Sequence, residues 1–364
     1  MAADNPWTDV YRSRRVLVTG NTGFKGSWLS IWLHQLGADV LGYSLDPPTT
    51  PALFTQAGVS QFVTQVRGDV RDLEQLTKVW NEFRPEVVFH LAAQSIVRTS
   101  YRLPVDTVST NVLGTVMVME AARLQQTPVA LVLITSDKCY ENREWERGYA
   151  EDDTLGGRDV YSGSKAAAEI LISSYRQSFF GLSARVPVAS ARAGNVIGGG
   201  DWASDRIVPD TVRALQAGEP VRVRNPGAVR PWQHVLEPLS GYLQLGAALM
   251  VRNCRELESA FNFGPTPDNV QSVGALVSLA VKCWGSGEWR DESEPGAPHE
   301  ATLLQLDIAR AGRMLGWRPR WNFEEAVAMT VDWYGAVARG ESSLERCRTQ
   351  IAAYETHLCA SGAR

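Results

Sequence analysis

Short apolar runs alternate with amphipathic stretches over the first half of the chain. Residues 15–19 form a β-branched run that ends at Gly20, and residues 26–37 then repeat apolar side chains at helical spacing. Further short apolar runs cover residues 40–45, 62–66, 87–91 and 129–135. Continuous apolar runs of this length are typical of strands that are covered on both faces. The pattern therefore predicts an α/β fold with a doubly wound parallel (Rossmann) sheet.

The regular alternation stops near residue 190. Residues 192–201 form a loop-rich stretch, helical periodicity returns at 205–218 and 237–251, and residues 261–263 are a candidate strand. Residues 285–299 are rich in glycine, proline and charge, which indicates an exposed connection. With 364 residues, a division into two domains is expected.

We expect the following domain boundaries. An NAD-binding Rossmann domain covers residues 12–190 with a returning stretch at about 233–264, and a smaller, mixed α/β C-terminal domain that binds the substrate covers 191–232 and 265–340. Residues 341–364 form a polar tail, which we expect to be only loosely attached.

Composition excludes several classes of protein. The 36 basic and 40 acidic residues are nearly balanced, which gives no reason to expect a nucleic-acid or membrane partner. The five cysteines are odd in number and never form a CxxC pair, and the histidines lack ligand spacing, so we expect neither a disulfide framework nor a metal site. No apolar run approaches membrane-helix length, and the first residues lack the apolar middle of a signal peptide. We therefore expect a cytoplasmic protein.

A glycine-rich loop separates the first predicted strand from the first helix. Gly20, Gly23 and Gly26 form the pattern GxxGxxG at this junction. Such a loop lets the backbone approach a pyrophosphate, which then faces the positive end of the helix dipole. The alternative is a tight turn without a ligand. Asp46 follows the second strand without an Arg or Lys close behind it, which favours NAD over NADP if Asp46 binds the ribose and does not merely cap a turn.

A tyrosine and a lysine stand four residues apart on a predicted helix. Tyr161 and Lys165 therefore project from one face, where the ammonium and the oxidised nicotinamide of NAD should lower the tyrosine pKa and make the phenol a general base. Ser136 lies at the carboxyl end of a buried strand, where it can bind the same substrate hydroxyl. The tyrosine-lysine spacing alone also fits two ordinary residues on a helix surface.

Three longer motifs carry a resemblance to a known family. They are TGNTGFKGSWL at residues 19–29, SDKCYEN at 136–142 and ARAGNVIGGGDWA at 191–203. Together with Ser136, Tyr161 and Lys165, they resemble the extended short-chain dehydrogenase/reductase family, and within it the nucleotide-sugar dehydratases that act on CDP-glucose. The resemblance covers nearly the whole chain. Asn21 departs from it, because a histidine is usual at that position.

The two residues after Ser136 distinguish the chemistries of this branch. The resemblance implies small, non-ionisable residues there in epimerases, and a Brønsted acid and base in 4,6-dehydratases. Asp137 and Lys138 therefore indicate dehydration, unless they only form salt bridges at a charged strand end. Most sugar-nucleotide dehydratases have a carboxylate where Lys138 stands. A lysine at its reference pKa of about 10.4 is a poor base, so desolvation or cationic neighbours must make it neutral.

The resemblance also implies which residues surround the two ligands. For NAD they are Gly20, Asn21, Thr22, Gly23, Phe24, Lys25, Gly26, Asp46, Asp69, Val70, Leu91, Ala92, Ala93, Asn111, Tyr161 and Lys165. For the nucleotide sugar they are Gln94, Ser95, Asn195, Arg206, Arg230 and His234. Arginine can hold a diphosphate through two parallel hydrogen bonds, although a solvated basic strand has the same composition.

The expected activity is an NAD-dependent 4,6-dehydration. Tyr161 takes the proton of the sugar 4-hydroxyl, Lys138 removes the C5 proton, and Asp137 protonates the departing 6-hydroxyl. The alternatives are a dehydratase or 4-epimerase of another nucleoside diphosphate sugar, and a non-catalytic NAD-binding sensor. By analogy with the family, we expect a homodimer or homotetramer whose only other partner is the small nucleotide sugar.

Overall fold

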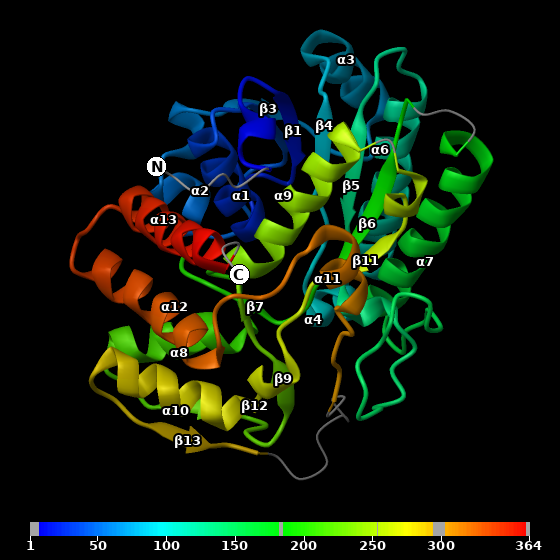
Figure 1. Ribbon diagram of the computed structural model, residues 1–364. Helices are drawn as coiled ribbons and strands as arrows, with labels where there is room; N and C mark the ends of the chain where they lie inside the picture. The colour runs from blue at the N-terminus through cyan, green and yellow to red at the C-terminus, as the bar shows by residue number, and fades with distance from the viewer. Residues whose placement is uncertain (1–6, 182–184, 253, 294–302, 362–364) are drawn as a thin grey trace.

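A parallel sheet forms the centre of the computed structural model, which describes residues 7–181, 185–252, 254–293 and 303–361. Seven strands of the described chain form it in the order β11-β6-β5-β4-β1-β2-β3 (Figure 1). They are β1 (Arg15–Thr19), β2 (Asp39–Ser44), β3 (Thr64–Arg67), β4 (Val87–His90), β5 (Ala130–Ile134), β6 (Val188–Arg192) and β11 (Ala260–Asn262). The order reverses between β1 and β4, so the predicted doubly wound Rossmann sheet is confirmed.

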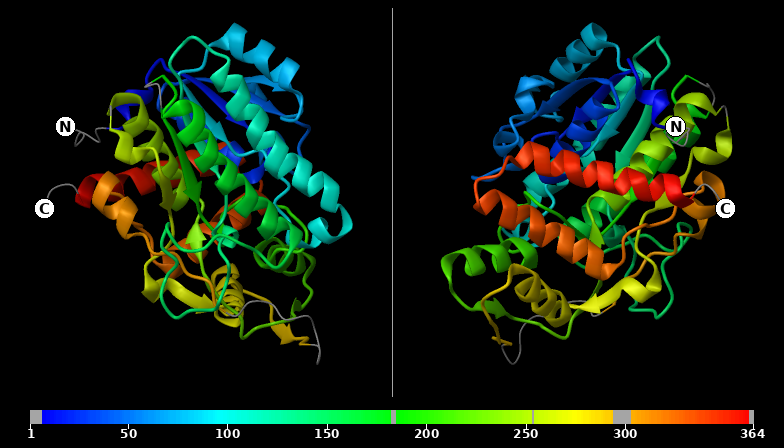
Figure 2. Two further views of the ribbon diagram at one scale, coloured as in Figure 1. Left: turned by 90° about the vertical axis from the view of Figure 1, so that its right-hand side faces the viewer. Right: turned by 60° about the vertical axis from the view of Figure 1, so that its left-hand side comes forward.

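Helices cover both faces of the sheet (Figure 2). Strand β1 shows why its sequence has no polar alternation: Val16 and Val18 pack into one apolar cluster, Leu17 packs into another, and all three are fully buried. The first face is covered by α1 (Phe24–Gln35) and α9 (Leu236–Val251), and the second by α3 (Leu73–Phe83), α6 (Gly114–Arg123) and α7 (Val160–Tyr175). Shorter helices of this half are η1 (Asp9–Tyr11), α2 (Leu53–Gln56), η2 (Val59–Gln61), α4 (Val97–Arg102), α5 (Pro104–Val108), η3 (Ser109–Leu113), η4 (Asp137–Cys139) and η5 (Arg176–Phe180).

After β6 the chain builds a smaller lobe and then returns to the sheet. Helix α9 packs on β5 and β4, and β11 pairs with β6. The elements of the lobe are β7 (Val196–Ile197), α8 (Ile207–Ala217), β8 (Val221–Val223), β9 (Val229–Pro231), β10 (Gln233–His234), η7 (Pro267–Asn269), β12 (Val270–Ser272), α10 (Val273–Trp284), β13 (Trp289–Asp291) and α12 (Phe323–Ala338). Two further short helices, η6 (Arg255–Leu257) and α11 (Ala309–Leu315), pack on α9 of the sheet domain. The expected exposed connection at 285–299 contains β13, which pairs with β8, and lies outside the described residues beyond 293.

The C-terminal segment corrects one expectation. Residues 341–364 were expected to be a loose tail, but α13 (Ser343–Ser361) is a docked helix that packs against α1 and α12. Cys347, Ile351 and Tyr354 are fully buried, and Trp32 Nε1 of α1 donates a 2.8 Å hydrogen bond to Glu355. The expectation was wrong because the abundant polar residues conceal a narrow apolar stripe at i, i+4 and i+7. Among the described residues, no helix is long and apolar enough to cross a membrane.

Candidate active site

The glycine loop lies between β1 and α1, where the backbone is crowded. Gly20 has a φ of +74°, and a Cβ there would lie 2.6 Å from the backbone nitrogen of Ala92. A Cβ at Gly26 would lie 2.2 Å from the carbonyl oxygen of Gly20. Gly23 then caps α1 without a side chain of its own. The first-turn N–H groups are therefore accessible to a pyrophosphate, and the loop fits the diphosphate of a dinucleotide.

Side chains within this loop tie it to the neighbouring strands. Asn21 is fully buried, its amide donates a 2.6 Å hydrogen bond to Gln65, and its oxygen accepts one of 2.8 Å from Ser44. Thr22 donates to the carbonyl oxygen of Leu45 at 3.0 Å. The side chain of Asn21, which was expected among the cofactor residues, therefore anchors the loop to β2 and β3.

Two acidic residues expected near the adenosine are paired with arginines. Arg67, at the end of β3, donates to both carboxylate oxygens of Asp46 at 3.0 and 2.9 Å, and both side chains are about 70% exposed. Asp69 accepts three hydrogen bonds from the side chain and one from the backbone of Arg71. These hydrogen bonds hold the pKa of each carboxyl group below its usual value. The fold thus brings to Asp46 a cation that lies 21 residues away in sequence.

The segment after β4 and its neighbours are held mainly by packing. Leu91, Ala92 and Ala93 are half-buried, and Val70 is buried against Gly114. Asn111 is buried too: its oxygen accepts from the backbone nitrogen of Gln94 at 2.9 Å, and its amide donates to Ser164 at 2.9 Å. The Asn111 side chain therefore holds the loop after β4 against α7.

The end of β5 carries the predicted acid and base. Ser136 Oγ donates to Asp137 Oδ1 at 2.9 Å and accepts from the backbone nitrogen of Lys138 at 3.2 Å. Asp137 is 2% exposed, its Oδ2 has no hydrogen-bond partner among the described residues, and a Cβ at position 194 would lie 1.8 Å from it. Gly194 thus makes room for the carboxylate. Lys138 is half-buried, and its ammonium has no ion-pair partner within the described part of the chain.

Helix α7 presents Tyr161 and Lys165 to this strand end. Asp159 caps the helix by accepting from the backbone nitrogen of Ser162 at 2.9 Å. Tyr161 and Lys165 are both buried, and a hydrogen bond links Tyr161 to Ser136. Lys165 Nζ lies 3.5 Å from the carbonyl oxygen of Ile134 at the end of β5. The structure therefore brings Ser136, Tyr161 and Lys165 together.

The protein's own groups act on the pKa of Tyr161 in opposite directions. Burial raises it to about 12, and the negative charge of Asp137 adds to that effect, while the hydrogen bond with Ser136 and the charge of Arg206 oppose it. Burial also lowers the pKa of Lys165 to about 8. The protein's own groups thus leave Tyr161 protonated at neutral pH, because desolvation of the phenolate outweighs its neighbours.

The predicted substrate residues divide into two groups. Arg206 donates to Ser95 at 3.3 Å and to Asp201 at 3.0 Å, and its charge acts on Tyr161, which places it near the catalytic residues. Asn195 has a φ of +49°, and Arg230 lies half-buried on β9. Their contact with a substrate stays a prediction.

The side chains of Gln94 and His234 make contacts within the protein. Gln94 donates to Thr107 at 2.8 Å and accepts from the backbone nitrogen of Ile96 at 2.6 Å. His234 is fully buried, edge-on to the rings of Trp28 and Trp321, and burial lowers its pKa to about 3. His234 has no exposed surface and packs as part of the core, and its contact with the substrate stays a prediction.

Lys25 has a larger place in the site than the sequence indicated. Burial lowers its pKa to about 7, and the charges of Arg206, Asp137 and Lys165 all act on it. Its ammonium is 6.0 Å from the centre of the Tyr242 ring. The sequence shows that Lys25 lies within the glycine loop, but the loop pattern does not show which charged groups lie near its ammonium. Among the described residues, no cluster of His, Cys, Asp and Glu could hold a metal ion.

The chain is similar to known sugar-nucleotide dehydratases. A family model described as GDP-mannose 4,6 dehydratase matches residues 17–330. The chain is 46% identical over 351 residues to a CDP-glucose 4,6-dehydratase of Salmonella typhimurium, covering 95% of this chain and 97% of the relative. It is 33% identical to a dTDP-glucose 4,6-dehydratase of Streptomyces antibioticus, over 88% and 92% of the two chains.

A solved structure agrees with these matches. The UDP-glucose 4-epimerase of Thermus thermophilus, in complex with NAD, superposes with a TM-score of 0.74 and 28% identity, over 88% of this chain and 98% of that chain. The chain therefore shares its fold with that epimerase. The chain belongs to the GDP-mannose 4,6 dehydratase family of extended short-chain dehydrogenases/reductases.

Proposed function

We propose that the protein is an NAD-dependent CDP-glucose 4,6-dehydratase, a hydro-lyase that converts CDP-D-glucose to CDP-4-dehydro-6-deoxy-D-glucose and water. The observation that carries the proposal is the 46% identity to a CDP-glucose 4,6-dehydratase over nearly the full length of both chains. The buried Asp137 beside the half-buried Lys138 supports dehydration rather than epimerisation, because elimination of water needs a proton donor and a proton acceptor.

The residues of the glycine loop fit NAD. At Gly20 and Gly26 the backbone approaches so closely that a Cβ would overlap it, which leaves the start of α1 open to a diphosphate. Asp46 would accept hydrogen bonds from the ribose, and its carboxylate also accepts from Arg67. Bound NAD would accept a hydride from C4 of the sugar and later return it to C6, so no external oxidant is consumed.

Tyr161 and Ser136 would act at the sugar 4-hydroxyl. Tyr161 would accept its proton, and Ser136 would turn its hydroxyl from Asp137 to donate a hydrogen bond to the same oxygen. Because the protein's own groups raise the pKa of Tyr161 to about 12, the positive charge of the oxidised nicotinamide has an essential part in lowering it. Lys165 supplies a second positive charge from the same helix face.

Lys138 and Asp137 would then eliminate water. A 4-keto group acidifies the C5 proton, which the Lys138 amine removes as the bond between C6 and its hydroxyl breaks. Asp137 in its protonated form gives its proton to the departing hydroxyl, so that the leaving group is water, and a proton returns to C5 when the hydride reaches C6. Oδ2 of Asp137 has no hydrogen-bond partner among the described residues, and it lies buried against Gly194.

Substrate screening tests the proposal. The purified protein is incubated with CDP-glucose, and the 4-keto product is followed by its ultraviolet absorbance in alkali; dTDP-, UDP- and GDP-sugars run in parallel. We expect product with CDP-glucose above all. Turnover of another nucleoside diphosphate sugar instead would assign the same chemistry to that sugar, and inactivity with every one of them would contradict an enzymatic function.

We also propose that the protein forms a homo-oligomer, at least a dimer. Large exposed apolar side chains gather on consecutive short helices α4, α5 and η3, at Tyr101, Leu103, Val105, Val108 and Leu113. Several large exposed apolar side chains close together in sequence favour a protein interface. Light scattering of the purified protein, with Val105→Asp as the disrupting variant, tests this: a monomeric wild type would contradict it.

A cytoplasmic location is part of the same proposal. Cys139 and Cys347 are buried free thiols, and Cys254 and Cys283 are exposed free thiols. Exposed free thiols suit a reducing compartment. Fractionation of the native host, with the protein recovered in the membrane-free cytosol, is the expected result.

A further inference from the structure

A buried carboxylate lies beneath the catalytic residues, and the proposed chemistry does not use it. Glu169 is on α7, four residues after Lys165 and eight after Tyr161, so all three side chains lie along one face of the helix. The Glu169 side chain is only 1% exposed. A buried carboxylate is costly unless other groups pair with it, so its partners indicate what it does.

Three side chains donate hydrogen bonds to Glu169. Thr135 donates to Oε1 at 2.5 Å, while Ser190 and Arg192 of β6 each donate to Oε2 at 2.8 Å. Burial alone would raise the pKa of Glu169, but the charge and hydrogen bond of Arg192, with Thr135 and Ser190, hold the pKa below its usual value. Glu169 is therefore ionised at neutral pH. Thr135 immediately precedes Ser136, so this carboxylate joins α7 directly to the strand end that carries the catalytic groups.

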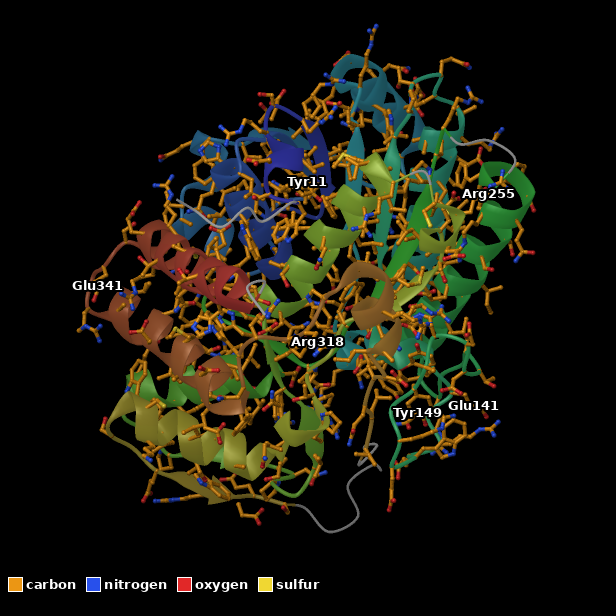
Figure 3. All side chains as sticks on the ribbon, in the orientation of Figure 1. Tyr11, Glu141, Tyr149, Arg255, Arg318 and Glu341 are labelled. Carbon is orange, nitrogen blue, oxygen red and sulfur yellow. The ribbon has the colours of Figure 1, made fainter. Side chains whose placement is uncertain are left out.

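Arg192 also holds the chain that follows Asp137 and Lys138. Its guanidinium donates to the Tyr140 hydroxyl at 2.7 Å, and that hydroxyl donates to Asn262 of β11 at 2.8 Å. The Tyr140 ring stacks on Tyr149, which Figure 3 labels on the loop that follows, with ring centres 5.2 Å apart. Residues on both sides of Asp137 and Lys138 are thus tied to one buried ion pair.

The charge of Lys165 depends on its neighbours. Burial lowers its pKa to about 8, while Glu169 and Cys139 act in the opposite direction. Burial raises the pKa of the Cys139 thiol, so this thiol is neutral at pH 7 and Glu169 supplies the negative charge. The other titratable groups that act electrostatically on Lys165 or Glu169 are neutral or cationic: Lys25 of α1, His90 of β4, Arg176 of η5 and Arg192 of β6.

We propose that Glu169 is a positioning residue for the reaction: it keeps Lys165 protonated and anchors the strand end that carries Ser136 and Asp137. This inference rests on the proposed dehydratase function. The ammonium matters because a positive charge beside Tyr161 favours the phenolate that accepts the sugar proton. Glu169 thus acts through Lys165 and Thr135, without touching the substrate.

The test is the pH profile of kcat for CDP-glucose with Glu169→Gln. The amide keeps the shape of the side chain and removes its charge, so Lys165 loses its proton at lower pH. Without that ammonium, Tyr161 ionises only at higher pH. We expect the acidic limb of the profile to move up by about one pH unit, and kcat at pH 7 to fall about tenfold.

Glu237→Gln is the control for the loss of a buried carboxyl group away from Lys165; burial raises the pKa of Glu237 to about 7. Glu237 is also a fully buried carboxylate, but it accepts hydrogen bonds from Tyr354 and from the backbone nitrogens of Arg320 and Trp321. Its replacement alters thermal stability and leaves the acidic limb in place. Glu169→Asp keeps the charge and should keep the wild-type limb with a lower kcat.

A second variant keeps the test informative if the unpaired Arg192 unfolds Glu169→Gln. Combining Glu169→Gln with Arg192→Gln removes both charges of the buried pair, and the shifted limb should persist. An unshifted limb in whichever of these variants folds would overturn the role of Glu169. Inactivity of the wild type with CDP-glucose would instead overturn the proposed function, so the two failures are distinguishable.

Discussion

The carboxyl ends of β2 and β5 lie on the same edge of the sheet but carry opposite arrangements of charge. Beyond β2, Asp46 and Arg67 form a bidentate pair, and both side chains are mostly exposed. Beyond β5, Asp137 is buried with one oxygen unpartnered, and Lys138 has no ion-pair partner among the described residues. At the end of β2 the acid and the base are paired with each other, whereas at the end of β5 they are not.

This difference separates binding from chemistry. An exposed ion pair costs little to form and contributes little to stability, so Asp46 and Arg67 can exchange partners with a ligand. A buried carboxylate without full hydrogen bonding costs stability, and it persists where a reaction requires it. We therefore expect changes at the end of β5 to reduce turnover with little effect on folding, and changes at the end of β2 to alter cofactor affinity.

Replacement of Tyr161 by Phe gives the largest expected effect. It removes the proton acceptor for the sugar 4-hydroxyl, so kcat should fall about 1000-fold or more, within the range of general acid–base contributions. The melting temperature should stay within a few degrees of the wild type. Tyr175→Phe on the same helix is the control and should keep turnover. A Tyr161→Phe enzyme with near-normal kcat would remove Tyr161 from the mechanism.

Lys138→Met should reduce dehydration about 100-fold. The C5 proton is then left without its base, so exchange of this proton with deuterated solvent should fall in parallel. Since the ammonium has no ion-pair partner among the described residues, the free energy of unfolding should change by less than about 0.5 kcal/mol. Lys78→Met on the exposed face of α3 is the control. Unchanged C5 exchange in Lys138→Met would assign the base to another group.

Acid should destabilise the fold through His90, next to the catalytic strand. Burial, and then the charge of Lys165, lower its pKa from 6.5 to about 3. Below pH 6.5 the unfolded chain binds a proton that the folded chain does not. This histidine therefore removes about 1.4 kcal/mol of stability per pH unit as the pH falls from 6.5 towards 3. Urea denaturation of wild type and His90→Asn between pH 5 and 7 measures it; equal slopes would contradict the assignment.

Asp46→Asn should have the smallest effect, and it acts on cofactor choice. The change releases Arg67 and removes a carboxylate that repels a 2′-phosphate, so NADP should bind about tenfold more tightly. Fluorescence titration measures the Kd values. The double variant Asp46→Asn with Arg67→Gln should lose the gain. If the double variant kept the tighter binding of NADP, Arg67 would have no part in phosphate binding.

Local sequence patterns predicted most of the sheet and the core of the site. Strands with continuous apolar runs, the glycine turn and the i, i+4 spacing of Tyr161 and Lys165 depend on neighbours in sequence, so they are readable without a structure. The same spacing points to Glu169, four residues further on, but only the pairing of β5 with β6 reveals that Arg192 and Thr135 meet it.

Features that depend on distant segments were missed or misassigned. Arg67 meets Asp46 only because β3 lies beside β2. The sequence placed His234 among the substrate residues, and only the fold shows that it is buried between two tryptophans. Among the protein's own groups, desolvation, which no motif reports, raises the pKa of Tyr161 more than neighbouring charges lower it, and the lowering expected from the nicotinamide charge stays a prediction.

The most direct test of the role assigned to the end of β5 is product analysis after turnover in deuterated water. With CDP-glucose labelled at C4 by tritium, we expect a 4-keto-6-deoxy product that carries the C4 label at C6 and solvent deuterium at C5. A product that keeps its 6-hydroxyl, or one with no solvent deuterium at C5, would contradict dehydration by Asp137 and Lys138.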